Sequence, residues 1–450
     1  MIYILILLSY LLVVINFEAS AKVSSMPNAL LLVEHTVVLM ICHYIIKKHF
    51  VKQKLQNRFF LFFIIGYCIS LFYMYYEWKP QLIKTFSTDW DAFDPIKYYS
   101  MATVSIQSGH LLDGMEWFPV SYVIYAILRI FGLHPLVPLF FNEVVFVYSI
   151  CTLTNFLNED RPFQIKYYSW LLLIPEALCF VATSSKDVLC MLCATIVFVK
   201  ASELLQKKIS LSKISIAALF YLIFIMSRTS LAMASVCGIM LTVVFAKKMT
   251  KQTIFLSAAI VTIMFAAFTL TDDLGSNADS ISKKVKTELS GDVSNSAELM
   301  GQSANSFAKK IIPHNTVEYI VFGFVRSICY IVIDPRFVKS PISTMVPLDG
   351  LTMLWLTDIT TLLMCISFFY ILLWLKKSFK HENRNVKSLF IVTFLYWYSV
   401  GTFNPLMIHV RYRVVYDILF FAIAIRTYLA YKHKVKVHQI NTIKRQFYSK

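Results

Sequence analysis

Charged residues and glycine are both scarce in this chain of 450 residues. Asp, Glu, Lys and Arg together make up 15% of it, and 11 residues are Gly. Soluble domains usually carry about 25% charged residues, which excludes a string of ordinary soluble domains. Neither G-x-G-x-x-G nor G-x-x-x-x-G-K-[ST] occurs, so no motif supports a nucleotide-binding fold. With 58% hydrophobic residues, the composition predicts an integral membrane protein.

The nine cysteines give no sign of a disulfide framework. Eight of them lie inside strongly apolar stretches and Cys329 lies in a milder one, so we expect small hydrophobic residues. Cys190 and Cys193 form a C-x-x-C pair. Because the pair falls inside a predicted membrane span, neither a redox nor a zinc role is expected of it.

Acidic residues are outnumbered, 26 against 43 Lys and Arg, which gives a net charge of +17. The surplus does not form the single basic surface that nucleic-acid binding would require, so nucleic acid is not an expected partner. It lies in short clusters between apolar runs, the pattern that the positive-inside rule places on the cytoplasmic side of a membrane. The clusters are Lys47–Arg58, Lys207–Lys213, Lys247–Lys251, Lys376–Lys380 and Lys432–Lys450.

Apolar runs of about 20 residues, or fewer where the ends snorkel, are long enough to cross a bilayer. The sequence contains twelve of them, which predicts a single all-α polytopic membrane domain over residues 1–450. The first run could instead be a signal peptide cleaved near residue 21, although no basic residues precede it. The predicted spans cover residues 2–16, 27–46, 59–76, 135–157, 168–183, 187–206, 214–227, 229–246, 253–271, 349–375, 388–403 and 412–431.

With the basic clusters on the cytoplasmic side, the remaining connections fall outside. They include a first external loop over 77–134 and a large external loop over 272–348. The apolar piece Trp117–Leu133 is not a further span, because it would invert the sides of the basic clusters that follow; we expect a re-entrant or surface-lying helix. Val317–Ile333 carries Arg326 in its middle and is not expected to span freely.

The first external loop carries three carboxylates within six residues, at Asp89, Asp91 and Asp94. Carboxylates this close repel one another, so at least one pKa rises unless a cation or metal shares the site. Such a group suits a general base or a metal ligand. The alternative is a solvated acidic turn in which Asp94 caps the helix that carries Tyr98. Glu116 is a further carboxylate of the same loop.

Two external turns add further polar groups. Lys186 and Asp187 begin a predicted helix, where they either contact substrate or form a solvated pair at a helix cap. Arg228 lies beside hydroxyl groups at the next turn, where it either binds phosphate or snorkels as an anchor. The positive-inside rule disfavours arginine outside, so an anionic ligand, a phosphate or diphosphate, is expected there. The other external residues of this kind are Arg326, Arg336, His409, Arg411 and Arg413.

Three stretches follow one another in the first half of the chain. They are Asp94-Pro-Ile-Lys-Tyr-Tyr in the first loop, the stretch that begins Phe118-Pro-Val-Ser-Tyr, and a Pro175-led helix that ends at Lys186-Asp187. Together they resemble the integral membrane glycosyltransferases of the GT-C superfamily. The later arginine-bearing segments and the large second external loop are similar to the O-antigen and capsule repeat-unit polymerases of the Wzy type. The chain departs from an Asp-Glu pair in having three spaced Asp.

The resemblance implies a glycosyltransferase of the bacterial cytoplasmic membrane whose active site faces the exterior and whose substrate is a polyprenyl-diphosphate-linked glycan. One of the three Asp would orient or deprotonate the acceptor hydroxyl, and the five external Arg would stabilise the leaving undecaprenyl diphosphate. It also implies a chain-length regulator and a flippase of the same pathway as partners. The residues expected to touch substrate are Tyr98, Glu116, Lys186, Asp187 and His409.

Three other functions stay open. One is the transfer of a single sugar from a polyprenyl phosphate, although five external Arg suggest more charge than one monophosphate carries. Another is a flippase or transporter of lipid-linked glycans, although no repeated halves are visible. A non-catalytic membrane scaffold is the third. No cofactor is required by any motif; a divalent metal ion is left open, because arginine can replace it at a diphosphate.

Overall fold

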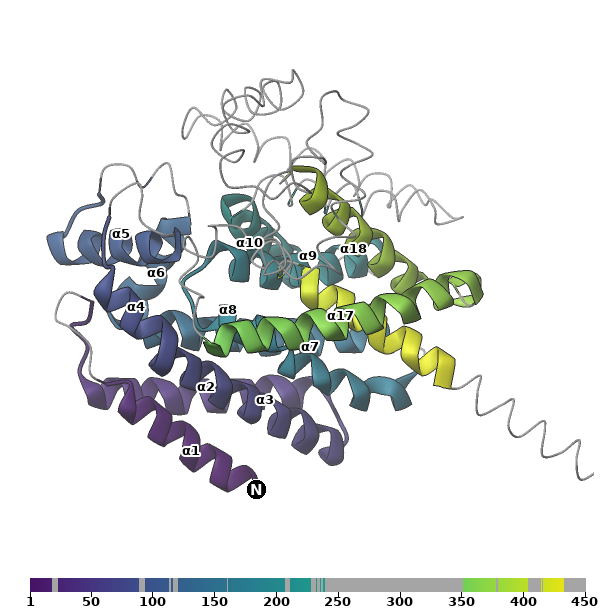
Figure 1. The fold of residues 1–450 in the computed structure, drawn as a ribbon, viewed down its shortest axis with the longest axis horizontal. Helices are drawn as coiled ribbons and strands as arrows, with labels where there is room; N and C mark the ends of the chain where they lie inside the picture. The colour runs from purple at the N-terminus through teal and green to yellow at the C-terminus, as the bar shows by residue number, and fades with distance from the viewer. Residues whose placement is uncertain are drawn as a thin grey trace, which may run out of the picture.

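Helices joined by short connections make up the described residues of the computed structural model, and no strand occurs among them. This part of the chain confirms the predicted all-α class (Figure 1). The predicted spans 229–246 and 253–271 lie outside it, apart from residues 232, 235 and 238, and so does the large loop 272–348. The described residues are 1–17, 23–88, 94–112, 115, 120–159, 161–206, 211–227, 232, 235, 238, 351–377, 379–403, 414 and 416–432.

The helices coincide with the predicted apolar runs in most places. A helix over 416–432 closes the described chain. In chain order the preceding elements are α1 (Ile2–Ile15), α2 (Asn28–His49), α3 (Gln53–Tyr73), the π-helix η1 (Met74–Trp78), α4 (Lys79–Lys84), α5 (Asp94–Ser108), α6 (Val120–Phe131), α7 (Leu136–Leu157), the 3₁₀-helix η3 (Pro162–Leu173), α8 (Pro175–Val181), α9 (Lys186–Gln206), α10 (Leu211–Ser227), α17 (Leu351–Lys377), the 3₁₀-helix η6 (Phe379–His381) and α18 (Arg384–Phe403).

Four helical stretches of the described chain are long and apolar enough to cross a membrane, where the sequence predicts twelve. They are Asn28–His49, Gln53–Lys84, Leu136–Leu157 and Ile359–Lys376. α2 and α7 have 22 residues each, or about 33 Å at 1.5 Å per residue, which matches a hydrocarbon core of ~30 Å. α1, α6 and α10 are apolar but shorter. Length and composition therefore support a chain embedded in a membrane.

The predicted span 168–183 is not one continuous α-helix. The 3₁₀-helix η3 occupies its first part, Ile174 is extended with ψ 113°, and α8 begins at Pro175. Proline has no N–H and disfavours the α conformation of the residue before it, so the helix breaks there. Gly66 of α3 lets this segment approach closely, because a Cβ at position 66 would lie 2.5 Å from the carbonyl oxygen of Leu172.

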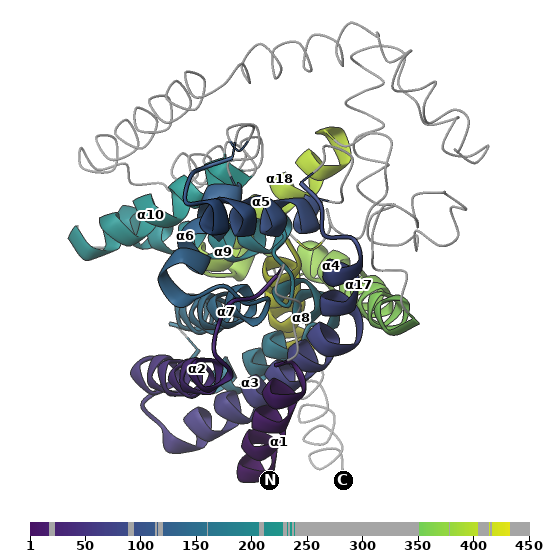
Figure 2. The same ribbon diagram turned by 90° about the vertical axis from the view of Figure 1, so that its left-hand side faces the viewer.

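The segment expected to lie on the membrane surface forms α6, which has 12 residues and is about 18 Å long. This length is too short for a bilayer crossing. Val120, Ile124 and Leu128 are buried, whereas Ile130 at its end is 72% exposed. α6 packs on α5 and α7. Figure 2 shows α2 and α7 nearly end-on while α5 runs across the view, so α5 does not run parallel with these long helices.

The molecule has two chemically different ends, and α7 and α9 connect them. At one end of α7 the amide of Asn142 donates to the carbonyl of Thr183 at 3.0 Å, and at the other end Asn155 donates to the carbonyl of His49 at 2.9 Å. α9 begins at Lys186, and Lys200, about 21 Å further along its axis, lies over the ring of Tyr148 near His49.

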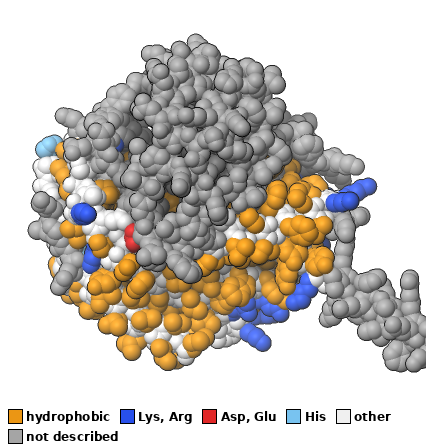
Figure 3. All heavy atoms as spheres, in the orientation of Figure 1, with side chains coloured by type: hydrophobic (Ala, Val, Ile, Leu, Met, Phe, Trp, Pro, Cys, Tyr) orange, Lys and Arg blue, Asp and Glu red, His pale blue; other side chains and the backbone are white. Residues whose placement is uncertain are grey.

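His49 directly follows Lys47 and Lys48 and is followed by Lys52, Lys54 and Arg58, so we call this the basic end. It lies toward the right in Figure 1, where α2 turns into α3, whereas α4, α5 and α6 lie at the left. Lys and Arg side chains gather along the lower right edge of a broad hydrophobic surface in Figure 3.

Candidate functional site

The structure describes four of the thirteen predicted site residues at least in part. Tyr98, Lys186 and Asp187 are described in full, and Asp94 is the first residue of α5. The other predicted site residues lie outside the described part of the chain: Asp89, Asp91, Glu116, Arg228, Arg326, Arg336, His409, Arg411 and Arg413.

Tyr98 and Lys186 lie far apart in sequence and meet in the structure. The ammonium of Lys186 lies 5.8 Å from the centroid of the Tyr98 ring, a cation–π contact. Tyr98 belongs to α5 and Lys186 begins α9. The contact therefore joins the predicted first external loop to the predicted second external turn. The sequence predicts both segments on the same side of the membrane, and the contact is compatible with that prediction.

The turn that carries Lys186 is held rigidly by buried polar groups. Asn142 of α7 donates from Nδ2 to the carbonyls of Val181 and Thr183, at 2.9 and 3.0 Å. Ser185 Oγ accepts the backbone N–H of Asp187 at 3.0 Å and lies 3.2 Å from its Oδ2. Ser185 is thus the N-cap of α9, and the carboxylate of Asp187 complements the positive end of the helix dipole.

These contacts separate the predicted roles within the site. Asp187 is 2% exposed and serves the cap, which is the structural alternative to substrate contact that the sequence left open. Tyr98 is also 2% exposed. A ring this buried offers little surface to a sugar, whereas the cation of Lys186 beside it has the charge that suits an anionic ligand.

α5 is anchored from its other side by Tyr99. The phenol donates to the carbonyl of Val23 at 2.7 Å. Burial raises the pKa of Tyr99 well above its ordinary range, and a hydrogen bond to Thr103 opposes the shift. The phenol therefore stays protonated and remains a donor at any physiological pH.

The neighbouring connection between α6 and α7 contains His134, which is fully buried. Its Nδ1 accepts the backbone N–H of Leu136 at 3.1 Å. The pKa of His134 is lowered from 6.5 to about 4, mainly by burial; a hydrogen bond to the backbone of Phe17 opposes the shift, and the charge of Lys79 adds to it. The imidazole is therefore neutral at pH 7 and acts as a structural acceptor.

No group of three or more His, Cys, Asp or Glu side chains that could hold a metal ion occurs among the described residues. Comparison with known proteins adds no identification: no protein-family model, no curated protein and no solved structure matches the chain. The site has to be interpreted from its own geometry.

Three buried polar residues at this end of the molecule were not predicted from the sequence. Lys97 is 3% exposed and Lys79 6% exposed, although both belong to the predicted external loop. Glu77, on η1, accepts a 2.6 Å hydrogen bond from Gln81 and is buried too. Lysine is almost never buried without compensation, and two lysines on the side that the positive-inside rule disfavours were a signal available in the sequence.

Proposed function

We propose that this chain is a membrane-embedded glycosyltransferase that polymerises polyprenyl-diphosphate-linked oligosaccharide repeat units at the outer face of the bacterial cytoplasmic membrane. The observation that carries the proposal is the contact between Lys186 and Tyr98. It places α5, which begins at Asp94, against the turn that begins α9. Both lie at the end of the molecule away from the basic end.

The charges of the two ends support the proposed orientation. The basic clusters favour the cytoplasmic side, which leaves the α5–α9 contact outside. Short helices beside the first loop, α5 and α6, fit the GT-C-like arrangement that the sequence resembles. The twelve-span topology, with its second large external loop, belongs to the same proposal.

The proposed reaction exchanges one bond for another at an anomeric carbon. A sugar hydroxyl of one lipid-linked unit attacks the anomeric carbon of a second lipid-linked chain, and a glycosidic C–O bond forms. The C–O bond to the diphosphate breaks, and undecaprenyl diphosphate leaves with its electron pair. An Asp of the first loop takes the hydroxyl proton, and Lys186, with the external Arg, stabilises the charge that develops on the diphosphate.

The runner-up function is the transfer of one sugar from a polyprenyl monophosphate to a glycan or lipid acceptor. It uses the same carboxylate and the same cation, so Lys186 alone favours neither version. The five external arginines of the sequence, Arg228, Arg326, Arg336, Arg411 and Arg413, suit two phosphates better than one, which favours the polymerase.

The test is complementation of a bacterium that lacks its surface-polysaccharide polymerase and carries the genes adjacent to this one. The glycan ladder is read on a gel. Wild-type protein is expected to restore long chains, and Asp94→Ala or Arg411→Ala to leave single repeat units. If no glycan forms at all without the protein, the step lies earlier and single-sugar transfer or flipping replaces the polymerase.

A further inference from the structure

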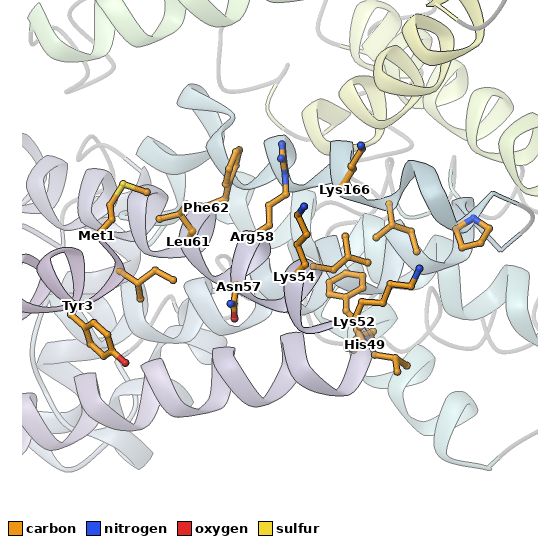
Figure 4. Close-up of a pocket in the computed structure, with 16 residues that line it drawn as sticks. Met1, Tyr3, His49, Lys52, Lys54, Asn57, Arg58, Leu61, Phe62 and Lys166 are labelled. Carbon is orange, nitrogen blue, oxygen red and sulfur yellow. The ribbon is translucent and has the colours of Figure 1, made fainter.

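A cavity of about 950 Å³ opens at the basic end, on the opposite side of the molecule from the candidate active site. The start of the chain, the first turns of α3 and the beginning of η3 enclose it (Figure 4). Its cationic lining residues are Lys52, Lys54, Arg58 and Lys166, and none of the described residues that line it is Asp or Glu. Such a volume is within the range of small-molecule sites.

Arg58 is held in place by groups that leave its outer nitrogens available. Its Nε donates to Ser169 Oγ at 3.0 Å, and its guanidinium lies 5.1 Å from the centroid of the Phe62 ring. Among the described residues it has no acidic partner. A guanidinium fixed in this way is suited to a phosphate, whose oxygens match the remaining pair of N–H donors.

The cations and the apolar wall of the cavity adjoin each other and meet where Arg58 lies over the Phe62 ring. In Figure 4 the side chains of Lys54, Arg58 and Lys166 point to the same side of α3. Leu61 and Phe62 lie one to two turns further along the helix, toward Met1. The cavity thus offers a charged part and an apolar part, as an amphipathic ligand requires.

The cavity also lies at the level where a membrane surface is expected. Trp170, whose ring packs edge-on against Phe62 at 4.9 Å, is 55% exposed, and Tyr3 is 87% exposed. Exposed Trp and Tyr are enriched at the membrane–water boundary. Leu7 and Leu11 of α1 are exposed as well, so a lipid chain beside the cavity meets an apolar surface.

We propose that this cavity binds an anionic phospholipid of the cytoplasmic leaflet. The phosphate contacts Lys54, Arg58 and Lys166, and an acyl chain lies along Leu61 and Phe62. Basic pockets between membrane helices on this side of a bilayer take anionic headgroups. The proposal is independent of the glycosyltransferase activity, because the site lies at the other end of the molecule.

The test measures binding of phosphatidylglycerol to the purified full chain in neutral detergent, by native mass spectrometry and by the shift in thermal unfolding midpoint. Phosphatidylcholine and glycerol 3-phosphate are the comparison ligands. We expect phosphatidylglycerol to bind selectively. Removing two cations, in K54Q/R58Q, is expected to weaken the binding of phosphatidylglycerol about thirtyfold. Each Lys or Arg near an anionic lipid contributes roughly 1 kcal/mol to the binding free energy, and about 1.4 kcal/mol corresponds to a tenfold change in affinity.

A control variant, K376Q/K380Q, removes two exposed lysines of another basic cluster that do not line the cavity. It is expected to bind like the wild type. Because Arg58 also donates to Ser169, K54Q/K166Q provides a second variant; within the described part of the chain neither of its lysine side chains forms a hydrogen bond to another element. Equal loss in K376Q/K380Q and K54Q/K166Q overturns the proposal, and so does binding of glycerol 3-phosphate as tight as that of the lipid.

Discussion

Arg426 and Glu382 form a buried ion pair. Nε and Nη2 of Arg426 both donate to Glu382 Oε2, at 3.1 and 2.9 Å, and the two side chains are 1% and 3% exposed. Nη1 donates to Gln164 Oε1 at 3.0 Å. The pair therefore ties the helix over 416–432 to η3 and to the residue that follows η6.

We expect Glu382→Gln to destabilise the protein by about 3 to 5 kcal/mol, because it removes the counter-charge that lies 2.9 Å from the buried guanidinium. Unfolding of the purified protein in detergent measures the change. The double variant E382Q/R426Q should lose less than the sum of the two single variants, since it buries no unpaired charge.

The matched control is the pair between Lys213 and Glu203, which is 3.1 Å long but has side chains 31% and 16% exposed. Lys213→Gln is expected to cost no more than about 1 kcal/mol, because the Lys213 side chain is partly exposed and Lys200 remains 3.5 Å from the same carboxylate oxygen. An equal loss of stability in Glu382→Gln and Lys213→Gln would show that the buried pair contributes no more to stability than the partly exposed one.

Gly66→Ala tests the close packing of α3 on η3. In an open helix the change would stabilise by up to about 1 kcal/mol. Here the new Cβ would lie 2.5 Å from the carbonyl oxygen of Leu172 and 3.1 Å from Leu178 Cδ2, so backbone has to move. We expect a net loss of about 1 to 3 kcal/mol, seen as a lower unfolding midpoint. A higher midpoint would contradict the packing.

His134 predicts a dependence of stability on pH. Its pKa is about 4 in the folded protein and 6.5 ordinarily, so below pH 6.5 the unfolded chain binds the proton more readily. The stability that neutral His134 contributes is complete above pH 6.5 and falls between pH 6.5 and 4, by up to about 3 kcal/mol.

His134→Gln keeps an acceptor for the N–H of Leu136 and cannot titrate. The unfolding midpoints of wild type and variant are compared from pH 7.5 to 4.5. The wild type is expected to lose stability more steeply as pH falls, and the difference between the two isolates His134 from the carboxylates. Parallel curves would contradict its neutral, buried state.

Helix positions were predictable from the sequence because apolar runs and basic clusters are local features. α7, for example, covers 136–157 where the sequence predicts 135–157. The break in the predicted span 168–183 follows from Pro175, yet the 3₁₀ form of η3 depends on its packing against α3. For Tyr98 and Lys186 the sequence predicted only that both lie on the same side of the membrane, and it did not predict their contact. Its distance, and the capping role of Asp187, depend on tertiary contacts that spacing in one sequence does not contain.

The proposed orientation predicts which residues a membrane-impermeant thiol reagent reaches. The seven described cysteines are buried or half-buried, so we expect them to react slowly, and the unmodified protein measures the background of all nine cysteines of the chain. Lys54 and His110 are exposed and lie at opposite ends of the molecule. We expect His110→Cys to be labelled in intact cells and Lys54→Cys only after the membrane is opened. The reverse pattern would place the α5–α9 contact in the cytoplasm and contradict the external site.

Lys186→Met removes the cation of the candidate site and keeps the length of the side chain, while the cap by Ser185 and Asp187 is retained. If Lys186 stabilises the leaving diphosphate, the variant should be at least about tenfold slower in glycan transfer, the loss typical of a charge-stabilising group. Lys213→Gln, in the first turn of α10, should have wild-type activity.

The most direct test of the central claim uses the purified chain in proteoliposomes with a lipid-linked repeat unit as its only substrate. Longer lipid-linked glycan and released polyprenyl diphosphate are measured together by mass spectrometry. The account predicts both products in equal amounts from the wild type, and neither from Asp94→Ala. Movement of the intact lipid-linked unit across the membrane, with no new glycosidic bond and no diphosphate released, would contradict it.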